Sequence, residues 1–157
     1  MKEKLTDLKE CYEKAMKLVE TESKHDPEND PYKSHYAARE MLIEMQNNLK
    51  NVLSTLAAED NPDEHDVLIY KAILGFILKE LGRISIFVDE LKTGENYLTE
   101  STTVFEEFKM EPVGIIAYID ALNNLGILWS NRNNAENAKK YLDQAEVAYN
   151  DFKASKK

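Results

Sequence analysis

Two stretches of the chain repeat one spacing of leucine and glycine, and this repeat constrains the fold more than any other feature. The first copy reads Leu78-x2-Leu81-Gly82-x2-Ser85, followed by Gly94-x3-Leu98-x2-Ser101. The second reads Leu122-x2-Leu125-Gly126-x2-Trp129, followed by Ala138-x3-Leu142-x2-Ala145. Residues three and four apart share one face of a helix, so each copy predicts two helices that meet through matching faces.

The residue types in this repeat have a packing reason. Glycine inside a helix costs about 1 kcal/mol relative to alanine, so we expect Gly82 and Gly126 where a partner helix comes close. Small residues should serve the same approach from the partner helix, at Gly94, Ser101, Ala138 and Ala145. Large residues should fill the remaining space, at Leu98, Leu142 and Trp129. The pattern is typical of the tetratricopeptide repeat (TPR), which reads W-x2-L-G-x2-Y and then A-x3-F.

Apolar residues at helical spacing predict six helices, separated by loops that contain proline or polar residues. Their expected ranges are 3–23, 32–56, 63–87, 90–109, 112–130 and 134–153. The second should bury a stripe that begins at Ala37 and Met41, and it should be capped by Asp30. Asp89 is expected to cap the fourth helix.

These helices predict an all-α fold of three antiparallel helix pairs, 3–56, 63–109 and 112–153, stacked as a TPR-like right-handed α-solenoid. A closed helical bundle is the alternative. The two copies start 44 residues apart, whereas TPRs repeat about every 34 residues. The first pair does not fit the pattern, and we expect it to be an atypical cap of one domain that spans residues 1–157.

Composition narrows the function. The 157 residues carry a net charge of -9, which opposes nucleic-acid binding and favours a basic protein partner. The chain has one cysteine, Cys11, and a charged start that is no secretion signal. Its most apolar stretch, 67–78, contains Lys71 and is too short to cross a bilayer. We expect a cytoplasmic protein without membrane insertion.

The sequence shows none of the spacings that mark common catalytic sites. It has no P-loop, no GxGxxG, no CxxC and no HExxH. His65, expected in an acidic loop, has no second histidine or cysteine nearby for a metal site. A helical-bundle enzyme with a carboxylate metal centre is a minor hypothesis, and it would need inward-facing Glu-x-x-His pairs. We therefore predict no enzyme activity, no catalytic residues, no cofactor and no metal.

Several segments resemble the KIF-binding protein family. The first segment is Asp26-Pro-Glu-Asn-Asp-Pro-Tyr-Lys-Ser-His-Tyr36, which resembles the first hairpin turn of that family. The second is Asn123-Asn-Leu-Gly-Ile-Leu-Trp-Ser130, followed by Ala138-x-x-Tyr141-Leu142 and Ala148-Tyr149-Asn150. The chain departs from the family pattern at Asp26, where asparagine is expected, and in a shorter acidic loop at 57–66.

The resemblance implies a function in binding. It implies the amino-terminal TPR region of a longer scaffold that binds kinesin motor domains and holds them off the microtubule. Such a scaffold is associated with the cytoskeleton and regulates microtubule-based transport, including mitochondrion transport, and neurogenesis. The kinesin that is bound and the oligomeric state stay open.

The TPR register also predicts which residues would contact a partner. The first helix of each TPR pair lines a concave groove, and the expected contacts are Lys79, Arg83, Asp120, Asn123, Asn124, Ser130 and Asn131. Phe87 and Ile127 share these faces. Asn123 and Asn124 are the strongest candidates, because asparagine is a poor helix former. An alternative partner is the carboxyl-terminal peptide that a TPR co-chaperone or adaptor captures, for which Lys79 and Arg83 are suitable. Tyr32, Lys33 and Tyr36 are expected to be structural.

Overall fold

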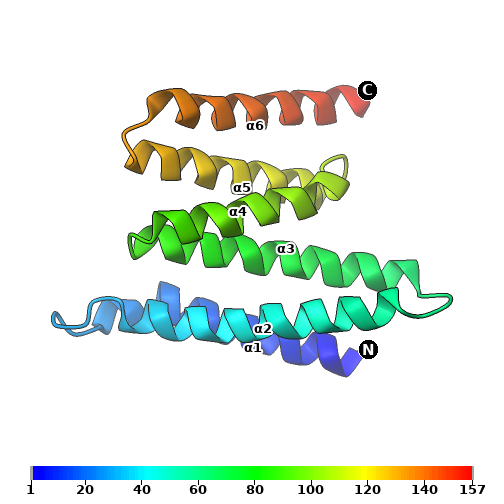
Figure 1. Ribbon diagram of the computed structural model, residues 1–157, viewed down its shortest axis with the longest axis horizontal. Helices are drawn as coiled ribbons and strands as arrows, with labels where there is room; N and C mark the ends of the chain where they lie inside the picture. The colour runs from blue at the N-terminus through cyan, green and yellow to red at the C-terminus, as the bar shows by residue number, and fades with distance from the viewer. Residues whose placement is uncertain (1, 157) are drawn as a thin grey trace. The chain divides into compact units, whose positions relative to one another are not determined.

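The computed structural model describes residues 2–156, and this part of the chain is helical without any strand. Its six α-helices confirm the six predicted from apolar spacing (Figure 1). The chain divides into two compact units, one ending at Asn61 and one beginning at Pro62. Each unit is described by itself.

The first unit consists of α1 (Lys2–Glu20), the short 3-10 helix η1 (Glu22–His25) and α2 (Lys33–Ala57), and α1 packs against α2. The apolar stripe expected on α2 was wrong at its start. Ala37 is exposed, whereas Ala38 and Leu42 are completely buried. The buried positions continue through Met45 and Leu49 at steps of three and four, so the inner face lies one residue further along than the stripe that begins at Ala37.

Asp26, not Asp30, caps the start of α2. The backbone N–H of Ser34 donates to Asp26 Oδ2 at 2.9 Å, and the Ser34 hydroxyl donates to Oδ1 at 2.6 Å. Tyr32 occupies the N-cap position and makes no capping bond with its side chain. The loop therefore folds back so that a carboxylate eight residues away satisfies a free N–H group in the first turn. The rings of Tyr32 and Tyr36 pack edge to face, 6.3 Å apart, as a structural role requires.

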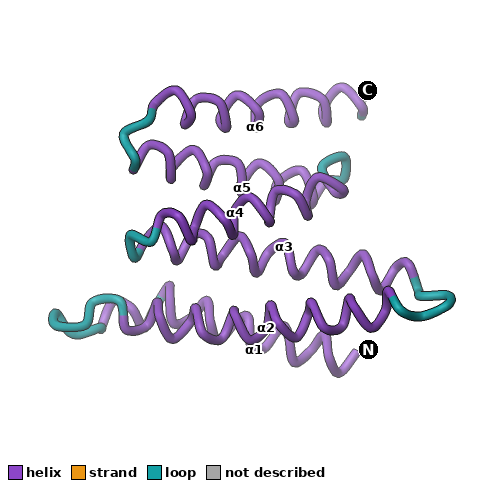
Figure 2. The backbone as a smooth tube through the Cα atoms, in the orientation of Figure 1, coloured by secondary structure: helices purple, strands orange, loops and turns teal. Residues whose placement is uncertain are grey.

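The second unit consists of α3 (Glu64–Phe87), α4 (Leu91–Phe105), the 3-10 helix η2 (Glu106–Phe108), α5 (Pro112–Asn131) and α6 (Ala135–Ser155). Within this unit, α4, α5 and α6 each reverse direction and pack against the preceding helix, and α5 also contacts α3 (Figure 2). The fourth predicted helix ends earlier than expected, because η2 replaces its last residues. Leucine is the commonest residue of the core, which contains Leu78, Leu81, Leu98, Leu122, Leu125 and Leu128.

The same turn joins α3 to α4 and α5 to α6. Glu90 N–H donates to Ser85 O at 2.8 Å, and Asp89 N–H donates to Ile86 O at 3.0 Å. Asn134 and Asn133 make the equivalent bonds one repeat later, both at 2.9 Å. This is a Schellman turn, in which one residue adopts a left-handed backbone conformation. Asp89 (φ 63°) and Asn133 (φ 59°) are those residues, so Asp89 ends α3 and the expected cap of α4 was wrong.

The repeated glycines lie where helices approach closely. A Cβ atom on Gly82 would meet Leu98 Cγ at 2.5 Å, and one on Gly126 would meet Leu142 Cδ2 at 3.1 Å. On α4, the same atom on Gly94 would lie 3.2 Å from the carbonyl oxygen of Gly82. The packing role expected for these glycines is therefore confirmed. Leu142 was expected to fill interior space like Leu98, but it is 49% exposed because no further helix of the second unit covers α6.

By length and composition alone, α5 is apolar enough to cross a membrane. Half of the apolar window of α5 is buried inside the protein. The central helix of a folded core has the same composition, so this property is weak evidence for a membrane span.

Candidate protein-binding surface

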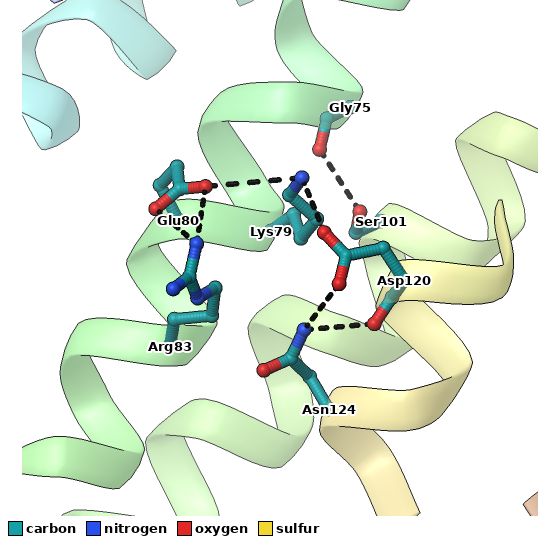
Figure 3. Close-up of polar contacts among 7 residues, drawn as sticks. All are labelled: Gly75, Lys79, Glu80, Arg83, Ser101, Asp120 and Asn124. Carbon is teal, nitrogen blue, oxygen red and sulfur yellow. Dashed lines mark hydrogen bonds and ion pairs between the residues drawn. The ribbon is translucent and has the colours of Figure 1, made fainter. Parts of the chain in front are cut away.

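Charged residues from α3 and α5 meet in the second unit (Figure 3). Lys79 lies on α3 and is only 8% exposed. Its Nζ donates to Asp120 Oδ2 on α5 at 2.7 Å and lies 3.8 Å from Glu80 Oε1. A buried ammonium group is costly unless it is paired, and these two carboxylates supply the pairing. The ion pair sets the position of α3 along α5.

Glu80 connects Lys79 to the surface residue Arg83. The Glu80 side chain is 7% exposed, and Arg83 Nη1 donates to its two oxygens at 3.1 and 3.3 Å. The Arg83 side chain is 53% exposed. The buried carboxylate therefore holds one edge of the guanidinium group while the rest of that group faces solvent.

Asn124 is engaged inside its own helix. Its Nδ2 donates to the backbone oxygen of Asp120 at 2.7 Å and lies 3.4 Å from Asp120 Oδ1. The residue is 8% exposed. The amide therefore bonds the Asp120 oxygen that does not bond Lys79, and so orients the carboxylate for the ion pair.

The neighbouring face of α5 is exposed and apolar. Val113, Ile116 and Ile127 share this face with Asp120 and Asn123 because they are spaced by three or four residues. Ile116 is 69% and Ile127 52% exposed. Phe87, one turn beyond Arg83 on α3, is 57% exposed. We define the α3–α5 surface as Arg83, Phe87, Ile116, Asp120 and Ile127.

The structure brings four of the seven expected contact residues together, namely Lys79, Arg83, Asp120 and Asn124. Asn123 is half-buried on the outer face of α5. Ser130 and Asn131 are exposed in the last turn of that helix. Ser130 lies ten residues beyond Asp120, which is about 15 Å along the helix at 1.5 Å per residue. Sequence analysis missed Glu80. Its signal was a charged Lys79-Glu80 pair within the otherwise apolar run Ile77–Leu81.

The side chains that the structure describes, those of residues 5–156, include no cluster of three or more suited to holding a metal ion. One Glu-x-x-His spacing does occur, at Glu22 and His25. Both residues are exposed on η1, so they do not face a bundle interior. His65 was expected in a loop, but it lies in the first turn of α3, where its N–H donates to Asp63 Oδ1 at 2.9 Å.

Curated proteins resemble this chain over nearly all of its length. The KIF-binding protein of Drosophila melanogaster is 40% identical over 154 residues, which is 98% of this chain and 26% of that protein. The KIF-binding protein of Gallus gallus is 36% identical over 143 residues, covering 91% and 23%. The KIF-binding protein of Homo sapiens is 32% identical over 162 residues, covering 91% and 26%.

No protein-family model and no solved structure matches the chain. The chain spans about a quarter of the length of the relatives above. Their similarity covers the segments of both units, including the residues of the α3–α5 surface. By its sequence, the chain belongs to the KIF-binding protein family.

Proposed function

We propose that this chain is a binding part of a kinesin-inhibiting scaffold, and that its α3–α5 surface docks a kinesin motor domain. The protein would act by binding and not by catalysis. It would work in the cytoplasm at the cytoskeleton and hold the motor off the microtubule. In this way it would regulate microtubule-based transport, including the transport of mitochondria, and it would also act in neurogenesis. The observation that carries the proposal is the exposed apolar face of α5 beside the Lys79–Asp120 pair, in a chain whose relatives are named for binding KIF proteins.

A TPR-like right-handed stack of helix pairs is part of this proposal. Two features support it in the second unit. Both helix pairs have the same Schellman turn, and both have a glycine opposite a leucine of the partner helix. Repeats of this kind present the first helix of each pair to a ligand, and here those helices are α3 and α5.

The charge of the chain supports a basic partner. A net charge of -9 attracts basic proteins over long range and speeds their encounter. Once contact is made, apolar residues such as Ile116 and Ile127 would supply affinity through burial, at about 25 cal/mol per Å² of apolar surface. Charge would therefore set the rate of association, and apolar contact would set how long the complex lasts.

The geometry weighs against the co-chaperone alternative. Binding a peptide carboxylate in a TPR groove requires accessible lysine and asparagine side chains. Lys79 is buried and paired with Asp120, and Asn124 donates within α5. Of the two basic residues expected in the groove, only Arg83 has an exposed side chain. Tight binding of an acidic carboxyl-terminal chaperone peptide would nevertheless favour that alternative.

The direct test is binding to a panel of recombinant kinesin motor domains. We expect the chain to bind at least one motor and to lower the fraction of that motor that sediments with microtubules. Ile116→Glu should weaken binding more than tenfold, since a charge would be placed in the buried contact. Val147→Glu is the matched control, because Val147 is 58% exposed but lies on α6. Failure to bind any motor, or equal loss in both variants, would contradict the proposal.

A further inference from the structure

The α3–α5 surface has an asymmetric distribution of charge. Its two charged side chains are Arg83, which is 53% exposed, and Asp120, which is 45% exposed. The charges beneath it are buried, since the Lys79 side chain is 9% and the Glu80 side chain 7% exposed. A partner that covers this surface therefore meets one cation, Arg83, and the half-exposed carboxylate of Asp120.

The Arg83 side chain is held in place before any partner binds. Its Nη1 bonds both oxygens of Glu80, one turn earlier on the same helix. Among the described side chains, those of residues 5–156, Glu80 is the one hydrogen-bonding partner of Arg83. A guanidinium group has five N–H donors, so Nη2 and Nε are left for another acceptor. A side chain that is already ordered loses less entropy when it forms a new bond.

The Glu80 carboxylate interacts with a second cation besides Arg83. Glu80 also lies 3.8 Å from the buried Lys79, whose ammonium group in turn bonds Asp120. Two cations therefore share the Glu80 carboxylate, and Arg83 stays electropositive toward solvent. Asp120 is already engaged by Lys79 and Asn124, which makes it a weaker site for an incoming charge.

Apolar residues flank Arg83. Phe87 follows it by one turn on α3. The Lys79–Asp120 pair joins α3 to α5, and the two helices run in the same direction. Phe87 and Ile127 follow that pair by eight and seven residues, so both lie toward the same end. Both side chains are more than half exposed. A partner that covers them would exclude water around the guanidinium group, and a lower dielectric strengthens an ion pair with it.

We propose that Arg83 is the charged anchor of this surface and that it receives a carboxylate of the partner, flanked by apolar side chains that cover Phe87 and Ile127. The inference rests on the proposed function, since it names the partner chemistry of the same surface. It also separates the long-range effect of net charge from the short-range effect of one ion pair. The overall charge of -9 speeds the approach of a basic partner, and one short-range pair at Arg83 slows its release.

The test uses a motor domain that binds the wild-type chain. Arg83→Gln should raise the dissociation rate about tenfold, equivalent to about 1.4 kcal/mol, and leave the association rate unchanged. Lys140→Gln is the matched control, because it makes the same change in net charge at an exposed position of α6. The double variant Glu80→Gln/Arg83→Gln avoids an unpaired buried carboxylate and keeps the net charge. It should lose as much affinity as Arg83→Gln.

Double-mutant cycles identify the acceptor. Each exposed Asp or Glu of the motor domain is changed to its amide and measured against wild-type chain and Arg83→Gln. Replacing one acidic residue of the motor domain should lower the affinity for the wild-type chain but leave the affinity for Arg83→Gln almost unchanged. The wild-type chain could bind while no acidic residue of the motor couples to Arg83, or the double variant could keep full affinity. In either case the assignment of Arg83 as the anchor is wrong, while the proposed function stands. If wild type binds no motor, the proposed function itself fails.

Discussion

At the scale of single residues, polar groups decide how α3 and α5 meet. On α3, Lys79 and Glu80 lie within the otherwise apolar run Ile77–Leu81, and each is more than nine-tenths buried. They are tolerated because Asp120 and Arg83 complete the set of charges. Replacing one partner leaves a buried charge uncompensated, which costs far more than losing an ion pair in water.

Two ion pairs of equal length allow a direct comparison. Lys79–Asp120 and Lys139–Asp143 both measure 2.7 Å, but the first lysine is 9% exposed and the second 77%. Asp120→Asn should lower the free energy of unfolding by about 1–2 kcal/mol. Asp143→Asn should lower it by less than about 1 kcal/mol. Urea unfolding of both variants is the measurement, and equal losses would show that burial of Lys79 has no energetic role.

His35 makes the stability of the first unit depend on pH. Burial lowers the pKa of His35 below its ordinary value of 6.5, and the Asp26 carboxylate partly opposes this shift. The unfolded state therefore binds a proton more readily, so stability is complete above pH 6.5 and is lost as the pH falls through 6.5 toward the folded pKa. His35→Gln should flatten this slope in thermal melts at a series of pH values.

Asp26 acts in a separate window. Hydrogen bonds from Ser34 hold the pKa of Asp26 below 3.8, so its contribution to stability is lost only as the pH falls below that value. A slope between pH 7.5 and 5 that survives His35→Gln would contradict the assignment.

At the scale of helices, the second unit uses one turn and one close approach twice. The turn requires a left-handed residue, and the close approach requires a small one. Asp89 and Asn133 adopt the left-handed conformation of the turn. Asparagine accepts this conformation better than most residues. Glycine fills the second role at Gly82 and Gly126.

Asp89 is therefore a position where glycine should stabilise the fold. Asp89→Gly relieves a left-handed conformation at φ 63° and should raise the free energy of unfolding by about 0.5 kcal/mol. The same change in the interior of α6, Asp151→Gly, should lower it by a few tenths of a kcal/mol. Chemical denaturation would measure both. A loss at Asp89 comparable to that at Asp151 would show that the Asp89 side chain has another role.

Two glycines should respond differently to alanine. A Cβ on Gly114 would lie 1.8 Å from the carbonyl oxygen of Phe108, which is backbone. A Cβ on Gly126 would lie 3.1 Å from the end of the Leu142 side chain, which can move. Gly114→Ala should cost about 3 kcal/mol or more. Gly126→Ala should change stability by less than about 1 kcal/mol, because helix propensity offsets the crowding. Similar melting temperatures for the two variants would contradict this.

At the scale of the whole molecule, the chain has two compact units, and the α3–α5 surface lies in the second. The connection between them contains Glu59, Asp60 and Asn61, all exposed and outside the helices. The charge of -9 belongs to both units together. The α3–α5 surface and its charges, by contrast, are built entirely from residues after Pro62.

Limited proteolysis can test the boundary between the units. A protease that cleaves after glutamate should cut first at Glu59, and at Glu28 in the loop before α2, because both lie outside helices. Glutamates within α3 and α4, such as Glu80 and Glu95, should resist, since a helix must open locally before cleavage. Glu59→Gln should remove the early cut between the units. Equally early cuts at Glu80 or Glu95 would contradict a compact second unit.

The sequence by itself determined the six helices, the close approach at Gly82 and Gly126, and the segments that place the chain in its family. These depend on local spacing, because apolar periodicity and glycine cost act within a few residues. Tertiary structure alone decided the partners that lie far apart in sequence. Asp26 caps α2 from eight residues away, and Lys79 meets Asp120 across two helices. Such pairs depend on how loops fold back and how helices slide past each other, and neither leaves a local signal. Four residues of the α3–α5 surface were therefore predicted, namely Arg83, Phe87, Asp120 and Ile127, whereas Ile116 was not. The burial of Lys79 and the exposure of Arg83 followed only from the packed helices.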